Sequence, residues 1–308
     1  MNKIVFTLIF CFSTQLNNLT AKNTSCDFLK IDISARQAGM GGAFCAIADD
    51  VAAIHFNPAG VSQIKQAELL LTHTKWIVDT NINFIGFLAP LKTFVLGGSI
   101  VYLSYAEIEA RDDNQQKIGT FSANDLAATI SFSKQLLLSN KDVASYGINM
   151  KIIRQQIEKE QSVGVAFDLG LLTSVLLPTL SHPISIGFSI QNISQKMKFI
   201  KEEHNLPLTA ILGFGYRVGV INFAIDFKHR VYERKTIFSF GTEYFPTKFV
   251  SLRLGYTNKD IVEQKHDNLL NFCGGFGINL FNRYQIDYTF LPYGVLGDTH
   301  KFSFLLKF

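Results

Sequence analysis

Residues that could carry chemistry concentrate in one stretch near the N-terminus, between Ala35 and Gly60. This stretch contains three closely spaced glycines, an acidic pair and a histidine, which are Gly39, Gly41, Gly42, Asp49, Asp50 and His55. Closely spaced glycines can form a nucleotide-binding loop, but that loop has the spacing G-x-G-x-x-G after a buried strand. Here the order is G-x-G-G and no buried strand precedes it, so the sequence disfavours a nucleotide site.

The acidic pair Asp49-Asp50 could bind a metal ion or act in acid–base catalysis. The seven histidines form no H-E-x-x-H motif and have no C-x-x-C partner, and G-x-S-x-G is also absent. We therefore interpret Asp49 and Asp50 as a turn or a cap. His55 is either a core residue of the stretch or a protonation-sensitive contact. The sequence predicts no enzyme, no metal site and no cofactor.

The stretch ends in Asn57-Pro58-Ala59-Gly60, which predicts a turn because Asn bonds locally and Pro fixes φ. It is too short and too polar to fold as a domain, so it must pack into another structure. Glycines would then mark positions where a side chain would collide with that structure. We interpret residues 22–66 as a hatch or plug, with a motif formed by Gly39, Gly41, Gly42, Asp49, Asp50, Asn57, Pro58 and Ala59.

The composition indicates what the plug fills. Only 18% of the 308 residues are charged, whereas 28 are Phe and 10 are Tyr. A mean hydropathy of +0.17 without an apolar run of 18 residues excludes a bundle of transmembrane helices. Apolar residues spread one in two are typical of a membrane β-barrel. The nearly balanced formal net charge of +4 argues against nucleic-acid binding.

The N-terminus has the features of a secretory signal peptide over residues 1–21. Lys3 precedes an apolar run from Ile4 to Phe12, and Ala21 supplies a small residue for cleavage. A membrane anchor is disfavoured because the apolar run is too short to span a bilayer. Among the remaining cysteines, Cys26 and Cys45 could form a disulfide in an oxidising compartment.

From Ala67 onward, apolar and polar residues alternate between turn signals, which predicts strands. Most candidates have about the 9–11 residues that a tilted strand needs to cross a bilayer. We predict an all-β fold in which residues 67–308 form a membrane-spanning antiparallel barrel of about fourteen strands. The candidates are Leu69–Val78, Asn81–Leu88, Thr93–Ser104, Asp125–Leu136, Ala144–Glu158, Val163–Thr173, Ile184–Ile193, Leu208–Val218, Ile221–Arg230, Thr236–Phe245, Phe249–Asn258, Asn271–Leu280, Tyr284–Leu291 and His300–Phe308.

The alternation also assigns side chains to the two faces of the wall. In a barrel that spans lipid, the apolar face looks outward and the polar face lines the lumen. The predicted lumen-facing polar residues are Asp168, Asp226, Lys228, Glu243, Arg253 and Asp287. Aromatic residues near strand ends fit either an interfacial girdle or ordinary strand positions, and they are Trp76, Tyr102, Tyr105, Tyr244, Tyr256 and Tyr293.

The connections orient the predicted barrel. Most connections after even-numbered strands are short, and the longest ones follow odd-numbered strands. In outer-membrane barrels the short turns are periplasmic, which predicts that both termini are periplasmic. A fourteen-stranded barrel is wide enough to leak, so we expect the plug to lie inside its lumen. The predicted location is the outer membrane of a Gram-negative-type bacterium.

Two segments resemble a known group of proteins. Residues 28–60, FLKIDISARQAGMGGAFCAIADDVAAIHFNPAG, and residues 296–308, LGDTHKFSFLLKF, resemble outer-membrane proteins of the FadL-like superfamily, and more closely its PorV/PorQ branch. The resemblance implies a hatch that includes Asn57-Pro58-Ala59. It also implies that Phe308 is the terminal residue recognised by the barrel-assembly machinery. Outer-membrane lipid and lipopolysaccharide would surround such a barrel.

The resemblance implies two alternative functions. PorV/PorQ proteins are accessory barrels of type IX secretion, and the modest length of this chain favours that reading, with secretion components as partners. FadL-like members are channels for long-chain fatty acids or other hydrophobic molecules, which would make the partner a hydrophobic ligand. An apolar cavity beside the hatch and a break in strand pairing would favour transport, whereas a closed lumen that is polar throughout would favour the secretion role.

Overall fold

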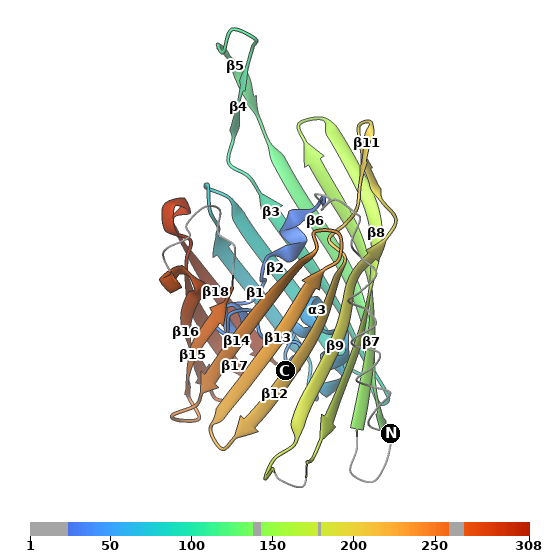
Figure 1. Cartoon of the computed structure of the whole chain (residues 1–308), viewed down its shortest axis with the longest axis vertical. Helices are drawn as coiled ribbons and strands as arrows, with labels where there is room; N and C mark the ends of the chain where they lie inside the picture. The colour runs from blue at the N-terminus through green and yellow to red at the C-terminus, as the bar shows by residue number, and fades with distance from the viewer. Residues whose placement is uncertain (1–23, 138–142, 178–179, 259–267) are drawn as a thin grey trace.

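A computed structural model describes residues 24–137, 143–177, 180–258 and 268–308, and the predicted signal peptide lies outside these ranges. Fourteen antiparallel strands close into a barrel when β1 pairs with β18 (Figure 1). The barrel strands are β1 (Glu68–Lys75), β2 (Asn81–Pro90), β3 (Val95–Ser104), β6 (Ala123–Leu137), β7 (Val143–Ile157), β8 (Glu160–Val175), β9 (Ile184–Ser194), β12 (Thr209–Val218), β13 (Ile221–Arg230), β14 (Lys235–Tyr244), β15 (Val250–Thr257), β16 (Phe272–Leu280), β17 (Tyr284–Pro292) and β18 (Asp298–Lys307). The predicted strands correspond to these one for one.

Alternation of side chains explains why each strand has one face toward the lumen and one toward lipid. In β13, Ala224 and Asp226 are fully buried inside the barrel, while Phe227 is 44% exposed on the outside. The same outward exposure holds for Ile130 of β6 and Leu171 of β8. Such a surface would be unstable in water but fits a bilayer, and the closed hydrogen-bonded wall leaves no unpaired edge. The prediction of a membrane-spanning barrel is confirmed.

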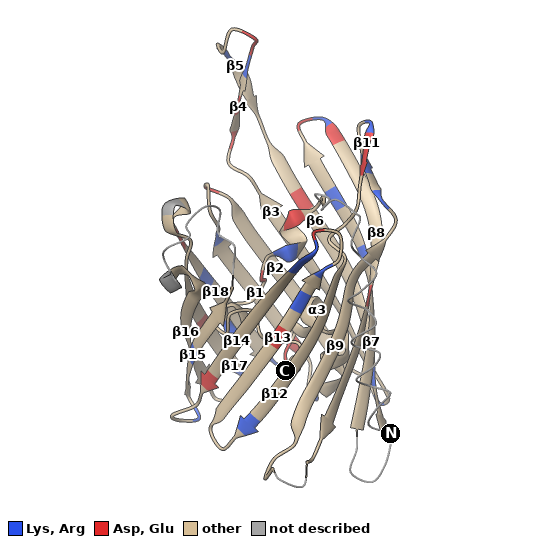
Figure 2. Cartoon of the chain, in the orientation of Figure 1, with Lys and Arg blue, Asp and Glu red and all other residues tan. Residues whose placement is uncertain are grey.

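The two ends of the barrel differ. The end that contains Phe308 has short connections and is here called the turn end. The opposite end, the loop end, carries two hairpins that the sequence did not predict, β4–β5 (Ile108–Arg111 and Lys117–Phe121) and β10–β11 (Met197–Phe199 and Glu202–His204). Many of the Lys, Arg, Asp and Glu residues of the loop end lie on these hairpins (Figure 2). The sequence does not predict the hairpins because their strands have only three to five residues, too few to show an alternating pattern.

Residues 24–66, here called the luminal segment, lie inside the barrel. Their four short elements are η1 (Asp27–Lys30), α2 (Ala35–Ala38), α3 (Ala53–Phe56) and η2 (Pro58–Gln63). The wall contacts the segment from several sides: Ser303 of β18 accepts a hydrogen bond from the Ala35 N–H at 2.9 Å, and Asn149 of β7 donates one to the Ile54 carbonyl at 2.7 Å. Among the described residues, no helix is long and apolar enough to cross a membrane.

The luminal segment runs the full length of the barrel. Thr24 hydrogen-bonds to Glu233 at the loop end, whereas the Phe308 N–H bonds to the Ala67 carbonyl at the turn end. The sequence predicted that both termini lie on one side, but Thr24, the first described residue, lies at the opposite end from Phe308. The reason is that the segment must cross the lumen before the chain can enter β1.

The same crossing separates two cysteines that could have paired. Cys26, Cys45 and Cys273 are buried, and Cys26 and Cys45 form no disulfide with each other. Cys26 lies near the loop end with its sulfur 3.6 Å from that of Met197, while Cys45 lies deeper beside Asn57. The open possibility of a disulfide between Cys26 and Cys45 is therefore not realised.

Candidate functional site

The Asn57-Pro58-Ala59 motif fixes the luminal segment to the barrel wall. Asn57 is fully buried; its side-chain Oδ1 accepts a hydrogen bond from the Ala59 N–H, and its side-chain Nδ2 donates to the Cys45 carbonyl at 2.9 Å and to the Leu171 carbonyl of β8 at 3.0 Å. This close approach requires two wall glycines, Gly147 and Gly170, which have no distinguishing local pattern in the sequence. A Cβ on Gly147 or on Gly170 would lie 2.2 Å from Pro58 or Asn57 respectively.

The glycines of the segment meet the opposite wall in the same way. Gly41 has φ +67°, and a Cβ there would lie 2.6 Å from the Tyr256 carbonyl oxygen of β15. Gly255 of the same strand faces it, because a Cβ on Gly255 would lie 2.0 Å from the Gly41 nitrogen. Gly42 also has a positive φ of +78°, whereas Gly39 is helical and lies against Thr289. The expected reasons for these glycines, collision and strained φ, both occur.

Charged groups fix the part of the luminal segment that lies near the turn end. Arg36, which the sequence analysis did not single out, donates from Nε and Nη2 to the two oxygens of Glu243, both at 2.9 Å. Its Nη1 also contacts Asp49 at 2.5 Å and Asp50 at 2.9 Å. Glu243 in turn binds Arg253 at 2.8 Å. The network couples the segment to β14 and β15.

The six predicted lumen-facing residues all lie on the inner side of the wall. Beyond Glu243 and Arg253, Asp287 binds the Arg253 Nη1 at 2.7 Å, and Lys228 lies 5.6 Å from the ring of Phe56. The other two carboxylates have partners outside the predicted set. Their contacts are Asp226 with the N–H groups of Phe44 and Cys45, and Asp168 with Lys151.

The acidic pair and the histidine of the segment have structural surroundings. Asp50 accepts the Ala52 N–H at 2.8 Å at the start of α3, in addition to its contact with Arg36. The ring of His55 packs edge-on against Phe56, with ring centroids 4.9 Å apart. Among the described residues, no group of three or more His, Cys, Asp or Glu side chains could hold a metal ion.

The lumen has an apolar side as well as a polar one. Inward side chains of β1, β2 and β3 form one hydrophobic core with the luminal segment, and the wall residues include Leu70, Ile82, Phe84, Leu88, Val95, Val101 and Leu103. Phe28, Ile33, Phe44 and Ile54 are among the residues that pack against them from the segment. The interior is thus closed but not polar throughout.

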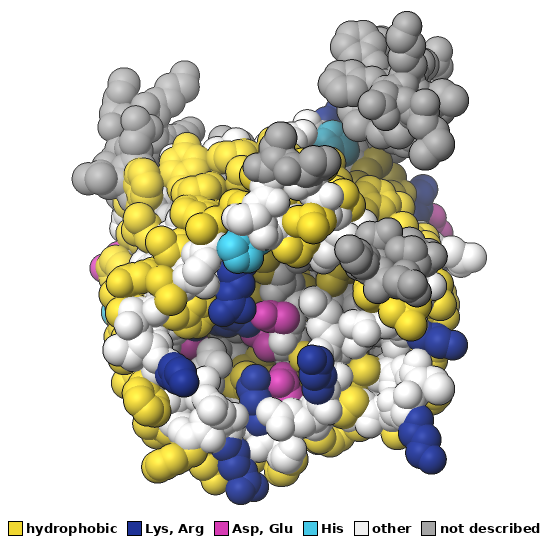
Figure 3. Space-filling view, turned by 90° about the horizontal axis from the view of Figure 1, so that it is seen from below, with side chains coloured by type: hydrophobic (Ala, Val, Ile, Leu, Met, Phe, Trp, Pro, Cys, Tyr) yellow, Lys and Arg dark blue, Asp and Glu magenta, His cyan; other side chains and the backbone are white. Residues whose placement is uncertain are grey.

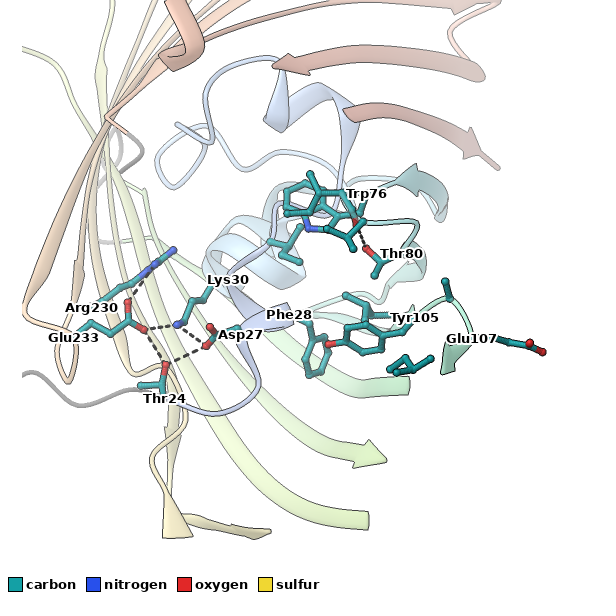
Figure 4. A pocket seen from close by; sticks show the side chains of 16 residues that line it. Thr24, Asp27, Phe28, Lys30, Trp76, Thr80, Tyr105, Glu107, Arg230 and Glu233 are labelled. Carbon is teal, nitrogen blue, oxygen red and sulfur yellow. Dashed lines mark hydrogen bonds and ion pairs between the residues drawn. The ribbon is translucent and has the colours of Figure 1, made fainter. Parts of the chain in front are cut away.

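A cavity of about 900 Å³ opens above this apolar side, at the loop end (Figure 4). Its floor is η1 of the luminal segment, and its aromatic wall contains Phe28, Trp76 and Tyr105. Leu103 and Phe28 belong both to the cavity lining and to the hydrophobic core beneath it. The apolar wall of the cavity therefore continues directly into the apolar side of the lumen.

The far side of the cavity is charged but internally paired. Lys30 contacts both Glu233 and Asp27, and Arg230 lies 3.3 Å from Glu233. Thr24 donates a hydrogen bond to Glu233 at 2.8 Å (Figure 4). Burial raises the pKa of Glu233, but the Lys30 ammonium and the Thr24 hydroxyl lower it more, so that its pKa lies below the ordinary 4.5. These contacts hold the start of the luminal segment against the β13–β14 turn.

We expect acid to loosen this attachment. Because the pKa of Glu233 is lower in the folded protein than in the unfolded chain, its contribution to stability is complete above pH 4.5 and is lost as the pH falls through the folded value. Trp76, the single tryptophan of the chain, lines the same cavity. Its fluorescence should shift to longer wavelength below pH 4.5, and Glu233→Gln should show the shifted spectrum already at pH 7. A wild-type spectrum that stays constant until the barrel itself unfolds in acid would contradict this.

The amino-acid sequence alone does not predict this cavity. Trp76 and Tyr105 were considered for an interfacial girdle, yet they line the cavity, whereas Tyr102 and Tyr244 are exposed on the outer face. The cavity residues come from the luminal segment, the β1–β2 and β3–β4 connections and the β13–β14 turn. Non-glycine residues with positive φ occur in three of these segments, at Cys26, at Val78 and Asp79, and at Arg234, and the sequence does not reveal them.

Fold and interior together define a class of protein. A closed fourteen-stranded antiparallel barrel with an internal N-terminal segment is similar to solved FadL-type outer-membrane channels. The toluene transporter TbuX of Ralstonia pickettii matches with a TM-score of 0.59 and 12% identity, over 90% of this chain and 98% of that one. The toluene transporter TodX of Pseudomonas putida gives 0.57 and 13%, over 88% and 96%. A FadL homologue of Pseudomonas aeruginosa gives 0.54 and 9%, over 90% and 98%.

The family follows from the sequence match. The model of the uncharacterised protein family UPF0164 matches residues 13–265, and the chain belongs to this family. A UPF0164 protein of Treponema pallidum is 25% identical over 241 residues, which cover 72% of this chain and 56% of that protein. The match thus spans little more than half the length of the relative. These comparisons support FadL-like architecture and give no support to the PorV/PorQ branch.

Proposed function

We propose that the protein is an outer-membrane channel that admits uncharged hydrophobic small molecules, with the loop-end cavity as the first binding site. The observation that carries this proposal is the continuity between the aromatic wall of the cavity and the apolar side of the lumen. Ligand sites are typically concave and mostly apolar, with a few polar groups that fix orientation. The similarity to hydrocarbon channels supports the same reading.

The charges of the cavity favour a neutral ligand over a fatty-acid anion. Its lining contains Asp27, Glu107 and Glu233 against Lys30 and Arg230. Both cations already contact carboxylates of the protein, so a ligand carboxylate would have to displace Glu233 or Asp27. Leaving a buried charge unpaired is costly. A ring-sized neutral molecule could instead lie between Phe28, Trp76 and Tyr105 without disturbing these pairs.

We further propose that the turn end faces the periplasm and the loop end the exterior. The support is the usual placement of short turns and of the C-terminal strand in outer-membrane barrels. In this orientation the cavity is open to the medium, and the luminal segment separates it from the periplasm. The secretion-accessory function has no comparable support, because the lumen is not polar throughout and a cavity adjoins the segment. A break in strand pairing, the other feature that would favour transport, is small in this barrel. Within the described part of the wall, the register between β8 and β9 shifts between Phe167 and Leu169. The Asn192 N–H donates a hydrogen bond to Asp168 across this irregularity.

Uptake of toluene and benzoate tests this function, because the two molecules share a ring and differ in charge. Bacterial cells without a channel of this type would express the protein, and entry of each labelled compound would be timed. We expect faster entry of toluene and no change for benzoate. Equal acceleration of both compounds would contradict selection of neutral ligands. No acceleration of either, with the barrel folded in the membrane, would contradict the transport function.

Filling the cavity should block that uptake. Ala106 is exposed in the cavity lining, so Ala106→Trp adds a large side chain there without disturbing the core. Ala110→Trp in β4, outside the lining, is the matched control. We expect Ala106→Trp to lower the toluene entry rate about tenfold, which is what loss of about 1.4 kcal/mol of binding would produce. Ala110→Trp should leave the rate unchanged. Equal rates in the two variants would mean that the cavity is not on the path.

A further inference from the structure

Exposed cations surround the turn end of the barrel, and they point to a lipid partner. Five Lys and Arg side chains are exposed in or beside its short connections, and they are Lys65, Lys92, Arg217, Lys248 and Arg283. In the view onto this end, Lys and Arg side chains lie around the margin and also beside the acidic side chains near the centre (Figure 3). Within the described part of the chain, none of the five cations makes an ion pair.

The acidic side chains at the turn end do not neutralise these five cations, because they already form ion pairs with other basic residues. Near the opening, Asp49, Asp50 and Glu243 contact Arg36, and Glu68 lies 3.2 Å from Lys307. The loop end is different, since acidic and basic residues alternate there along the β4–β5 hairpin, where Glu109 pairs with Arg111 and Lys117. The loop end also has exposed lysines, but Lys159 and Lys201 have acidic neighbours along the chain, whereas the described residues of the turn-end connections include no Asp or Glu.

Four of the five cations have a large exposed apolar side chain within two residues; the exception is Lys65, whose neighbour Ile64 is buried. Leu91, Phe249 and Phe281 are 50%, 61% and 85% exposed, and they lie one or two residues from Lys92, Lys248 and Arg283. Val218 adjoins Arg217 in the same way, at 42% exposure. The guanidinium groups lie over aromatic rings, with Arg217 5.9 Å from the ring of Phe245 and Arg283 5.7 Å from that of Tyr284.

We infer that this collar, defined as Lys65, Lys92, Arg217, Lys248 and Arg283, binds the phosphate groups of anionic phospholipids in the leaflet at the turn end. The apolar neighbours enter the acyl region, while the cations extend to the headgroups, as long basic side chains do at membrane interfaces. An anionic periplasmic polymer such as the cell wall would also attract cations. The lipid fits better, because the cations lie at the edge of the apolar band and beside exposed Phe and Leu side chains.

Selective retention of phospholipid tests this inference independently of transport. The full-length folded barrel would be equilibrated in mixed micelles with equal amounts of phosphatidylglycerol and phosphatidylcholine, and the lipid that stays bound after gel filtration would be quantified. One basic residue near an anionic surface contributes about a fivefold preference. We expect severalfold enrichment of phosphatidylglycerol on the wild type. Lys92→Gln, Arg217→Gln, Lys248→Gln and Arg283→Gln combined should bring the ratio close to one.

A variant with the same number of charges removed at the loop end is the control. Lys159→Gln, Lys196→Gln, Lys198→Gln and Lys201→Gln change four exposed cations outside the collar. This variant should retain the wild-type enrichment, and heat-modifiable migration would show that both variants are folded. Equal retention of the two lipids by the wild type, or an equal loss in both variants, would overturn the inference. Unchanged lipid retention together with lost binding to isolated cell-wall sacculi in the collar variant would assign the collar to the cell wall instead.

Discussion

Replacing Arg36 by methionine is expected to release the luminal segment and raise the ion conductance of the barrel. Arg36 is 8% exposed and contacts three carboxylates, Glu243, Asp49 and Asp50. Removal of one member of a buried ion pair typically costs about 3–5 kcal/mol, because the remaining charge stays buried without its partner. The wall, held by its own hydrogen bonds, should persist while the segment detaches. Planar-bilayer recordings on the purified protein would measure the change.

Two controls separate this effect from general loss of charge. Arg36→Lys keeps the positive charge but loses the two-point contact with Glu243, so an intermediate conductance is expected. Lys201→Met removes an exposed cation at the loop end and should leave the conductance at the wild-type level. If Arg36→Met is folded by heat-modifiable migration and conducts no more than the wild type, the network does not hold the segment in place.

Gly255→Val should displace the same segment by steric collision. A Cβ at this position would lie 2.0 Å from the Gly41 nitrogen and 2.4 Å from the Met40 carbonyl carbon, so backbone would have to move. Extra atoms in a packed site typically cost about 1–3 kcal/mol. Here that cost would weaken the packing of the luminal segment against the wall. We expect raised conductance and cleavage of the segment by added protease, with the barrel strands protected.

Gly98→Val is the matched control for this prediction. Gly98 lies in the wall strand β3, but the nearest atom to its added Cβ, the Thr129 carbonyl oxygen, is 3.4 Å away. The same substitution in the same kind of strand should therefore change neither conductance nor protease sensitivity. A similar response in both variants would mean that valine disturbs the wall itself, and the close approach of Gly41 to Gly255 would then not be the cause.

The strands of the wall were predictable because the alternation of polar and apolar residues continues along each of them. A strand between lipid and lumen needs opposite residue types at successive positions, and this places Asp226 inside from its neighbours alone. Glu243, Arg253 and Asp287 were assigned to the lumen by the same argument. Arg36, the partner of Glu243 in the luminal segment, was not found, although an arginine among small residues in a plug was a usable signal. Which carboxylate it binds depends on residues 207 positions apart.

The site was less predictable because it has no motif. Phe28, Trp76, Tyr105 and Glu233 come together only after the barrel closes and the luminal segment enters it. Their types are ordinary for the chain, and no spacing links them. The hatch motif was recognisable because a buried Asn-Pro turn restricts its own residues. The wall glycines that accommodate it, Gly147 and Gly170, are two among 22 glycines and have no local signature.

The course of the luminal segment from Thr24 at one end to Ala67 at the other restricts the order in which the protein can assemble. Chains rarely thread through a structure that is already closed. The barrel is closed by the pairing of its first strand, β1, with its last, β18, and a pairing so distant in sequence forms slowly. The segment must therefore be enclosed before that seam forms. Because it bonds to β7, β8, β13 and β18, it can act as an internal template that gathers the strands around itself before the barrel closes.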